Sequence, residues 1–245
     1  MKTLKNIFAR IWALWGICSF IITMLIVIIP ILITYFIPDP KGVEIFRRIS
    51  KIWMHVFLTL IGCRLRIKGR AYFEKKEVYV VVCNHNSLID ITLTTPFIPS
   101  ANKTIAKKSF AKIPLFGWIY KRGSILVDRK NIESRKESME LMKATLMSGI
   151  HMCIYPEGAR NRTDYPLKPF FSGAFKLAMV TQKKIIPCLI FNSKKTLPVN
   201  KFLYLWPQIL EIHFLTPLET KNYTDVEILK GDVYEIMQTH YIHFK

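Results

Sequence analysis

A chain of 245 residues can bury one substantial core with a short appendage. Its 36 Lys and Arg residues against 17 Asp and Glu residues give a formal net charge of +19, and 51% of its residues are hydrophobic. This basic and apolar composition indicates a partner that is both anionic and apolar, which we expect to be the anionic lipids of a membrane. Because no nucleic-acid-binding motif accompanies the basic residues, we expect no nucleic acid partner.

The cysteines favour a reduced, cytosol-facing protein without a metal site. They are odd in number and lack the C-x-x-C and Cys/His spacings that bind metals. Scattered thiols in apolar runs are typical of a reduced core. They are Cys18, Cys63, Cys83, Cys153 and Cys188.

The N-terminal part predicts membrane-associated helices. No charged residue occurs from Ile11 to Ile37, and a helix of that length reaches roughly 40 Å, more than the roughly 30 Å hydrocarbon core of a bilayer. From Val43 to Ile61, apolar residues recur at helical spacing, which favours an amphipathic second helix. We therefore expect N-terminal membrane-anchoring helices over residues 1–62 and an α/β domain over residues 63–245.

The orientation in the membrane stays open at this point. Basic residues flank the apolar segment on both sides, so the positive-inside rule gives no decisive asymmetry. They are Lys2, Lys5 and Arg10 before it and Lys41, Arg47, Arg48 and Lys51 after it. Two helices that enter and leave on one side would explain this distribution, and a single span is the alternative. We expect an inner or plasma membrane location with the α/β domain on the cytoplasmic face.

After Gly62, short apolar runs alternate with helical patterns. We predict strands at Arg64–Lys68, Val78–Cys83, Lys103–Ala106, Ser124–Val127, His151–Tyr155, Ile185–Phe191 and Ile209–Leu215. We predict helices at Leu88–Phe97, Leu115–Lys121, Ile132–Ser148, Gly173–Thr181 and Asp225–Thr239. This alternation favours an α/β fold with a mostly parallel sheet flanked by helices, in which the late strands can be antiparallel.

The first candidate site follows the run Val78–Cys83. This run is typical of a buried parallel strand, so the next residues should lie at the carboxyl edge of the sheet, where open α/β folds place their sites. His85 lies there, and Asp90 is close enough in sequence to hold one imidazole nitrogen. A histidine oriented in this way is a candidate general base. The alternative is a helix cap with a bystander histidine.

Two further stretches could bind an anionic substrate. Between Lys103 and Lys130, basic residues are interleaved with apolar ones, which favours contact with anionic lipid over the alternative of a solvated charged face. In Pro156-Glu157-Gly158-Ala159-Arg160, the arginine fork suits a phosphate, the carboxylate can accept hydroxyl hydrogen bonds, and the glycine allows close approach. The alternative here is a Glu/Arg pair on a surface turn.

Taken in order, these stretches resemble the glycerolipid acyltransferase superfamily with its N-H-x4-D block, most closely the bacterial 1-acylglycerol-3-phosphate O-acyltransferases. The resemblance runs from about Arg66 to Ile190. The matching blocks are Asn84-His85 with Asp90, Lys107-Lys108-Ser109 through to Asp128-Arg129, Pro156-Glu157-Gly158 with Arg160, and Ile186-Pro187. Ala159 and Asn161 depart from the usual third block, which bears on how the acceptor is bound.

The resemblance implies transfer of an acyl group from acyl-CoA or acyl carrier protein to the 2-hydroxyl of lysophosphatidic acid, giving phosphatidic acid. His85 would take the hydroxyl proton and Asp90 would orient the imidazole. Lys107, Arg129 and Arg160 would hold the acceptor phosphate, Glu157 would help fix the glycerol, and Gly158 would let the substrate approach the backbone. This chemistry needs neither a metal nor a bound cofactor. Two alternatives stay open: another lysolipid acceptor, such as a lyso amino-acid lipid, or a non-catalytic protein of the membrane surface.

Overall fold

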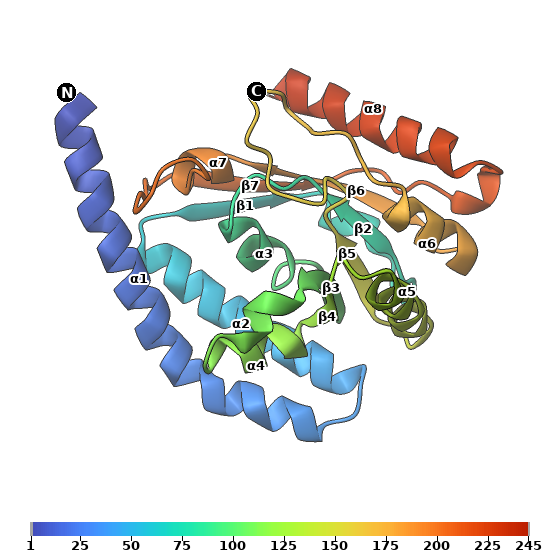
Figure 1. The fold of residues 1–245 in the computed structure, drawn as a ribbon, viewed down its shortest axis with the longest axis horizontal. Helices are drawn as coiled ribbons and strands as arrows, with labels where there is room; N and C mark the ends of the chain where they lie inside the picture. Colours follow the sequence, from blue (N-terminus) through green and yellow to red (C-terminus); the bar gives the residue numbers. More distant parts are fainter. Residues whose placement is uncertain (1, 245) are drawn as a thin grey trace.

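The computed structural model describes residues 2–244, which form one seven-stranded sheet with helices on both faces (Figure 1). Met1 and Lys245, at the outer ends of the two expected domains, lie outside the described residues. The strands are β1 (Arg64–Lys68), β2 (Val80–Cys83), β3 (Asn102–Lys107), β4 (Ser124–Val127), β5 (His151–Ile154), β6 (Ile185–Phe191) and β7 (Ile209–Phe214). The α-helices are α1 (Lys2–Ile33), α2 (Lys41–Leu60), α3 (Ile89–Thr94), α4 (Phe116–Arg122), α5 (Ile132–Met147), α6 (Gly173–Thr181), α7 (Ser193–Thr196) and α8 (Val226–Phe244).

The strand order in the sheet is β1-β7-β6-β2-β5-β3-β4. From β6 to β4 all neighbouring strands are parallel, whereas β7 is antiparallel to β6 and β1 is parallel to β7. The expected mostly parallel sheet is confirmed, and so is an antiparallel strand late in the chain. The carboxyl ends of β2, β3, β4 and β5 therefore meet at one edge of the sheet.

Successive residues of the central strands enter two different cores. Val81 and Cys83 of β2 face a cluster that contains Trp53 of α2 and Leu93 of α3. Val80 and Val82 face a second cluster formed with α5, α6 and α8. Because both faces are covered, all four residues of β2 are buried, as expected for a strand in the middle of a parallel sheet.

Several element boundaries differ from the sequence prediction. Helix α8 ends at Phe244 rather than Thr239, strand β2 begins at Val80 rather than Val78, and the short helix α7 was not predicted. Helix α3 ends at Thr94 rather than Phe97. The prediction was wrong because Pro96 has no backbone N–H to continue the helical hydrogen bonds. Helix α1 begins at Lys2 rather than Ile11, which is consistent with the high helix propensity of the Lys, Leu and Arg residues in its first turns.

The expected N-terminal helical pair is present. The segment Thr3–Phe36 is long and apolar enough to cross a membrane. Many of its apolar side chains are exposed; Leu4, Ile26 and Ile29 are 72, 69 and 68% exposed. The Trp53 indole of α2 donates a hydrogen bond to Thr23 Oγ1 of α1 over 2.9 Å, which holds the two helices together.

A buried arginine links this helical pair to the α/β part of the chain. Arg122, at the end of α4 and only 7% exposed, donates from Nη2 to Asp39 Oδ1 over 2.7 Å and to the Thr34 carbonyl over 3.0 Å. Lys103 Nζ lies 2.9 Å from the other Asp39 oxygen. Burial raises the pKa of Asp39, but the hydrogen bonds from Arg122 and Lys103 outweigh it and leave the pKa below its usual value. The carboxylate therefore stays ionised. Its two contacts hold the connection between α1 and α2 against α4 and β3.

Candidate active site

The first polar segment lies at the carboxyl end of β2, beside the end of β5. Val82 of β2 is in register with Ile154 of β5, so the residues after these two strands emerge next to each other. Asn84 is fully buried and bonds to the neighbouring strand β6, donating to the Ile190 carbonyl over 3.1 Å and accepting from the Ile190 N–H over 2.7 Å. This pair of hydrogen bonds to β6 fixes the backbone immediately before His85.

His85 and Asp90 are in direct contact. His85 Nδ1 lies 2.9 Å from Asp90 Oδ2, with Asp90 fully buried and the His85 side chain 14% exposed. The same carboxylate oxygen accepts the backbone N–H groups of Asn86 over 2.6 Å and Ser87 over 2.7 Å. Because this oxygen accepts both backbone N–H groups, it also accepts from the ring, which places the imidazole proton on Nδ1. The other ring nitrogen, Nε2, has no hydrogen-bond partner within residues 2–244, so it can accept a proton.

Glu157 braces the backbone of His85 instead of standing on the surface. It is 1% exposed; its Oε1 accepts the His85 N–H over 2.9 Å, and its Oε2 accepts the Lys168 N–H over 3.3 Å. Burial raises the pKa of Glu157 to about 7, against the opposing effect of these backbone hydrogen bonds. The alternative of a surface Glu/Arg pair on the turn is therefore wrong: Glu157 belongs to the support of the histidine.

The loop after Glu157 is organised by Asn161, one of the two departures from the family pattern. Its backbone N–H donates to the His85 carbonyl over 2.6 Å. Its fully buried side chain donates to the Tyr165 carbonyl over 2.9 Å and accepts from the Thr163 N–H over 2.9 Å. The Asn161 side chain therefore stabilises the loop 161–165, and its backbone N–H holds the His85 carbonyl, while Glu157 holds the His85 N–H.

The structure brings the predicted basic residues to the same edge but gives them different environments. Arg129 is engaged, because its Nη1 donates to the Gly158 carbonyl and so joins the end of β4 to the loop after β5. The exposed Lys107 side chain and the half-buried Arg160 guanidinium form no hydrogen bond or ion pair with the described part of the chain. Both are therefore available to a ligand, whereas Arg129 is already partly used.

Two residues that the sequence analysis missed also contact the site. Tyr155, directly after β5, lies against the His85 ring with the ring centroids 4.6 Å apart. Lys168 meets Glu157 through its backbone N–H, and its Nζ lies 3.5 Å from the Glu157 carbonyl. The position of Tyr155 at a strand end could have indicated it, but nothing in the pattern around Lys168 does.

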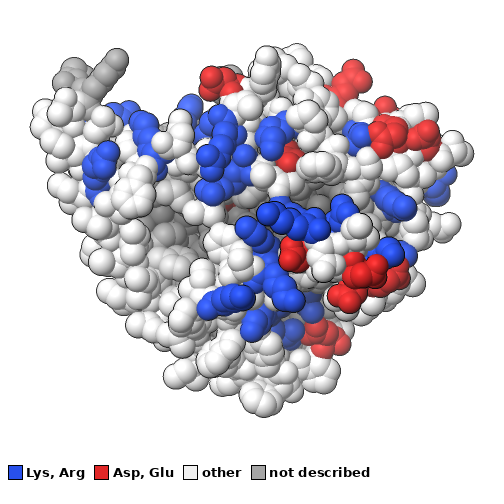
Figure 2. Space-filling view, viewed as in Figure 1, with Lys and Arg blue, Asp and Glu red and all other residues white. Residues whose placement is uncertain are grey.

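Positive charge gathers on one face of the molecule. In Figure 2, Lys and Arg side chains crowd the middle and upper part of the surface, around a hollow, and outnumber the acidic side chains there. The lower left of the same view, along α1, carries almost no charge. An apolar side next to a basic face is the distribution expected of a protein that contacts anionic lipid.

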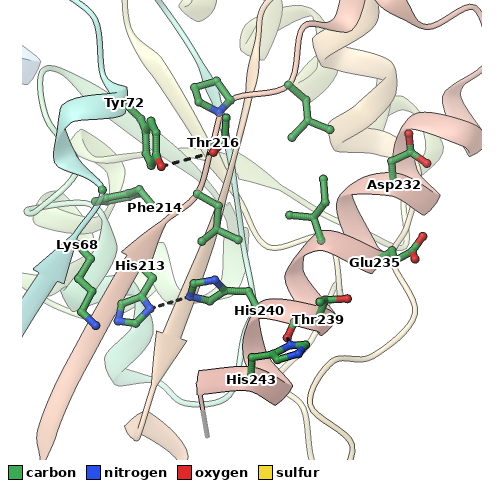
Figure 3. A pocket seen from close by; sticks show the side chains of 15 residues that line it. Lys68, Tyr72, His213, Phe214, Thr216, Asp232, Glu235, Thr239, His240 and His243 are labelled. Carbon is green, nitrogen blue, oxygen red and sulfur yellow. Dashed lines mark hydrogen bonds between the residues drawn. The ribbon is translucent and has the colours of Figure 1, made fainter.

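A separate cavity of about 890 Å³ lies between α8 and the ends of β1 and β7 (Figure 3). His213 of β7 and His240 of α8 point toward each other there, with His213 Nδ1 2.9 Å from His240 Nε2. Because β1 and β7 run opposite to β2, their carboxyl ends lie at the other edge of the sheet. This cavity is therefore not part of the site around His85.

Comparison with known proteins identifies the family. A family model described as Acyltransferase matches residues 64–191, just over half of the chain, including every residue named at the site around His85. The chain belongs to the acyltransferase family. The expected family resemblance is thus confirmed.

The chain is also similar in sequence to individual acyltransferases. The chain is 29% identical over 175 residues to a 1-acyl-sn-glycerol-3-phosphate acyltransferase of Cocos nucifera, covering 71% of this chain and 56% of that protein. It is 34% identical over 140 residues to the Helicobacter pylori protein of the same name, covering 57% of this chain and 58% of that one. The chain thus spans little more than half the length of these relatives.

The acyltransferase fold is also seen in a solved structure. The 1-acyl-sn-glycerophosphate (LPA) acyltransferase from Thermotoga maritima superposes with a TM-score of 0.80 at 20% identity, covering 100% of this chain and 98% of that chain. The agreement extends over the N-terminal helices as well as the sheet.

Proposed function

We propose that the chain is a 1-acylglycerol-3-phosphate O-acyltransferase, which moves an acyl group from acyl-CoA or acyl carrier protein to the 2-hydroxyl of lysophosphatidic acid. The observation that carries this proposal is the His85–Asp90 contact, with Nε2 left free at the carboxyl edge of the sheet. The names of the relatives, which are acyltransferases of this acceptor, point to the same substrate.

The geometry supports a general-base mechanism. His85 Nε2 takes the proton of the acceptor hydroxyl as the hydroxyl oxygen attacks the thioester carbonyl carbon. The Asp90 carboxylate, bonded to Nδ1, stabilises the imidazolium that forms. The carbon–sulfur bond then breaks, and the departing thiolate takes the proton from the imidazolium. The reaction needs no acyl-enzyme, metal ion or resident cofactor.

The acceptor phosphate is proposed to bind at Lys107 and Arg160, with Arg129 and Gly158 forming the adjoining wall. Lys107 and Arg160 are the two predicted cations that the described chain leaves free, and a planar guanidinium can hold a phosphate through two hydrogen bonds. The Arg129 contact with the Gly158 carbonyl supports including a third cation on this side of the site. Glu157 is proposed to act through the His85 backbone, in addition to any contact with the glycerol.

The membrane assignment rests on the N-terminal helices. The exposed apolar side of α1 and the net charge of +19 suit an anionic bilayer, with α1 and α2 in contact with lipid. We propose an inner or plasma membrane enzyme with the α/β domain on the cytoplasmic face, where acyl-CoA and acyl carrier protein are available.

The proposed reaction predicts a strong preference for an acceptor with a phosphate. Purified protein in detergent, given a radiolabelled acyl thioester, should convert lysophosphatidic acid to phosphatidic acid with a kcat/KM about 10²-fold higher than that for monoacylglycerol. The reason is that charge-assisted hydrogen bonds contribute about 1.5–3 kcal/mol each. Equal rates on the two acceptors would overturn the phosphate site. Product only with another lysolipid, such as a lyso amino-acid lipid, would keep the reaction type and replace the acceptor.

Arg160→Ala should raise the KM for lysophosphatidic acid by about tenfold while leaving the KM for the thioester nearly unchanged, because one charge-assisted hydrogen bond to the phosphate is lost. Steady-state kinetics with each substrate varied in turn measure both constants. Arg162→Ala is the matched control, since Arg162 is an exposed arginine on the same loop. An equal rise in both KM values would contradict the assignment of Arg160 to the acceptor.

A further inference from the structure

The imidazole of His85 is held by a second side chain besides Asp90. The Tyr155 ring, 8% exposed, lies with its centroid 4.6 Å from that of the His85 ring and at an angle of 36° to it. Asp90 fixes one nitrogen of the imidazole but leaves the ring free to tilt about that hydrogen bond. A packed aromatic ring on the face of the imidazole removes this freedom.

The hydroxyl of the same tyrosine reaches the helix that carries Asp90. Tyr155 Oη lies 2.5 Å from Thr94 Oγ1, and Thr94 Oγ1 lies 3.1 Å from the Asp90 carbonyl. One proton order satisfies all three groups: Tyr155 donates to Thr94, and Thr94 donates to the Asp90 carbonyl. Burial raises the pKa of the Tyr155 hydroxyl well above its usual value, so this donor keeps its proton at neutral pH.

We propose that Tyr155 is a positioning residue of the acyl-transfer reaction. Its ring sets the plane of the His85 imidazole, and its hydroxyl, through Thr94, sets the position of α3 and hence of Asp90. Tyr155 thereby fixes both members of the pair that directs Nε2 at the acceptor hydroxyl. The ring also lies next to the positive charge that the imidazole gains, which an aromatic face stabilises. This proposal rests on the proposed function, since it takes His85 as the base.

The test separates the ring from the hydroxyl. Tyr155→Leu removes both. Tyr155→Phe keeps the ring and removes only the Tyr155–Thr94 bond, whereas Thr94→Val removes that bond together with the Thr94 bond to the Asp90 carbonyl. We expect Tyr155→Leu to lower kcat by about 10²-fold with little change in either KM. Tyr155→Phe should lower kcat only about fivefold, the value of one hydrogen bond. The double variant Tyr155→Phe/Thr94→Val should be no worse than the more impaired single variant, because both changes break the same link.

The ring should also affect the protonation of His85, a readout that a purely structural role would not move. In Tyr155→Leu, the acid limb of the profile of kcat/KM against pH should move to lower pH, because the imidazolium loses the aromatic face. Tyr155→Phe keeps the ring and should leave the profile in place. The matched control is Tyr165→Leu, since Tyr165 is 77% exposed and contacts Asn161 only through its backbone carbonyl.

An NMR titration makes this test independent of turnover. Histidine-labelled protein in detergent carries six imidazoles, and the His85 signal is assigned as the one absent from His85→Ala. A His85 midpoint that moves in Tyr155→Leu but not in Tyr165→Leu supports the positioning role, even if lysophosphatidic acid proves to be the wrong acceptor. A midpoint and a kcat that both stay at the wild-type values would overturn it, whatever the thermal stability of the variant.

Discussion

His85→Ala should reduce acyl transfer to lysophosphatidic acid by about 10³-fold or more. Positioned proton transfer contributes typically about 10²–10⁴-fold, and the substitution also removes the group that returns the proton to the leaving thiolate. Binding should change little, because the backbone bonds of residue 85 to Glu157 and Asn161 do not depend on the side chain. The measurement is kcat and KM for both substrates with the radiolabelled thioester.

The control for this experiment is His243→Ala. His243 is an exposed histidine near the end of α8, whose Nδ1 bonds only to the Thr239 carbonyl of its own helix. Its removal should leave kcat within about twofold of the wild type. If His85→Ala kept wild-type kcat, the assignment of the base would be wrong. A drop in kcat together with a collapse of the melting temperature would instead show that the variant fails to fold.

Asp90→Asn asks whether the carboxylate orients the imidazole. Three donors, from His85, Asn86 and Ser87, converge on Asp90 Oδ2, so an amide oxygen in that place can keep the bonds but not the charge. The loss of activity should therefore appear in kcat rather than in KM.

The sequence alone predicted the positions of these groups because they depend on local patterns. A β-branched run without charges was enough to predict β2, and the bounds of β1, β4 and β6 were predicted to the residue. In a parallel sheet, strand ends meet at one edge, so the strand pattern alone indicates that His85 and Glu157 lie close together. The contact of His85 with Asp90 followed from their spacing at the start of a helix.

What the sequence could not predict depends on side-chain direction across distant segments. Glu157 was expected to face the glycerol, yet it turns inward to the His85 N–H, because that backbone donor would otherwise be buried without a partner. Arg129 was expected to be free for phosphate, yet it meets the Gly158 carbonyl. Tyr155 looked like the end of an apolar strand, and only the packing of α3 against β5 reveals its bond to Thr94.

His151→Asn should make the protein more resistant to acid relative to the wild type. His151 is 3% exposed, its Nδ1 accepts the Tyr79 N–H over 3.1 Å, and burial lowers its pKa to about 4. Between pH 4 and its ordinary value of 6.5, the unfolded chain binds this proton and the folded chain does not, so wild-type stability falls as the pH falls. Asparagine at this position can still accept the Tyr79 N–H but does not titrate.

The size of the effect follows from the same shift. From pH 7.5 to pH 4.5, wild type should lose about 2.5 kcal/mol of unfolding free energy through His151 that His151→Asn does not lose. For a chain of this size, that corresponds to about 5–10 °C in melting temperature. The measurement is the difference in melting temperature between variant and wild type in detergent at a series of pH values, which cancels the titrations common to both.

For Glu157→Gln, the difference in melting temperature from the wild type should change with pH in the opposite direction. The two variants together are therefore a strict test. Burial raises the pKa of Glu157 to about 7, so between pH 4.5 and 7 the folded chain binds a proton that the unfolded chain has released. On acidification, the unfolding free energy of the wild type therefore rises by about 3 kcal/mol through Glu157. Glu157→Gln lacks this increase. The melting temperature relative to wild type should thus rise toward acid for His151→Asn and fall for Glu157→Gln. Two slopes of the same sign would mean that one of these groups is hydrated in the folded protein.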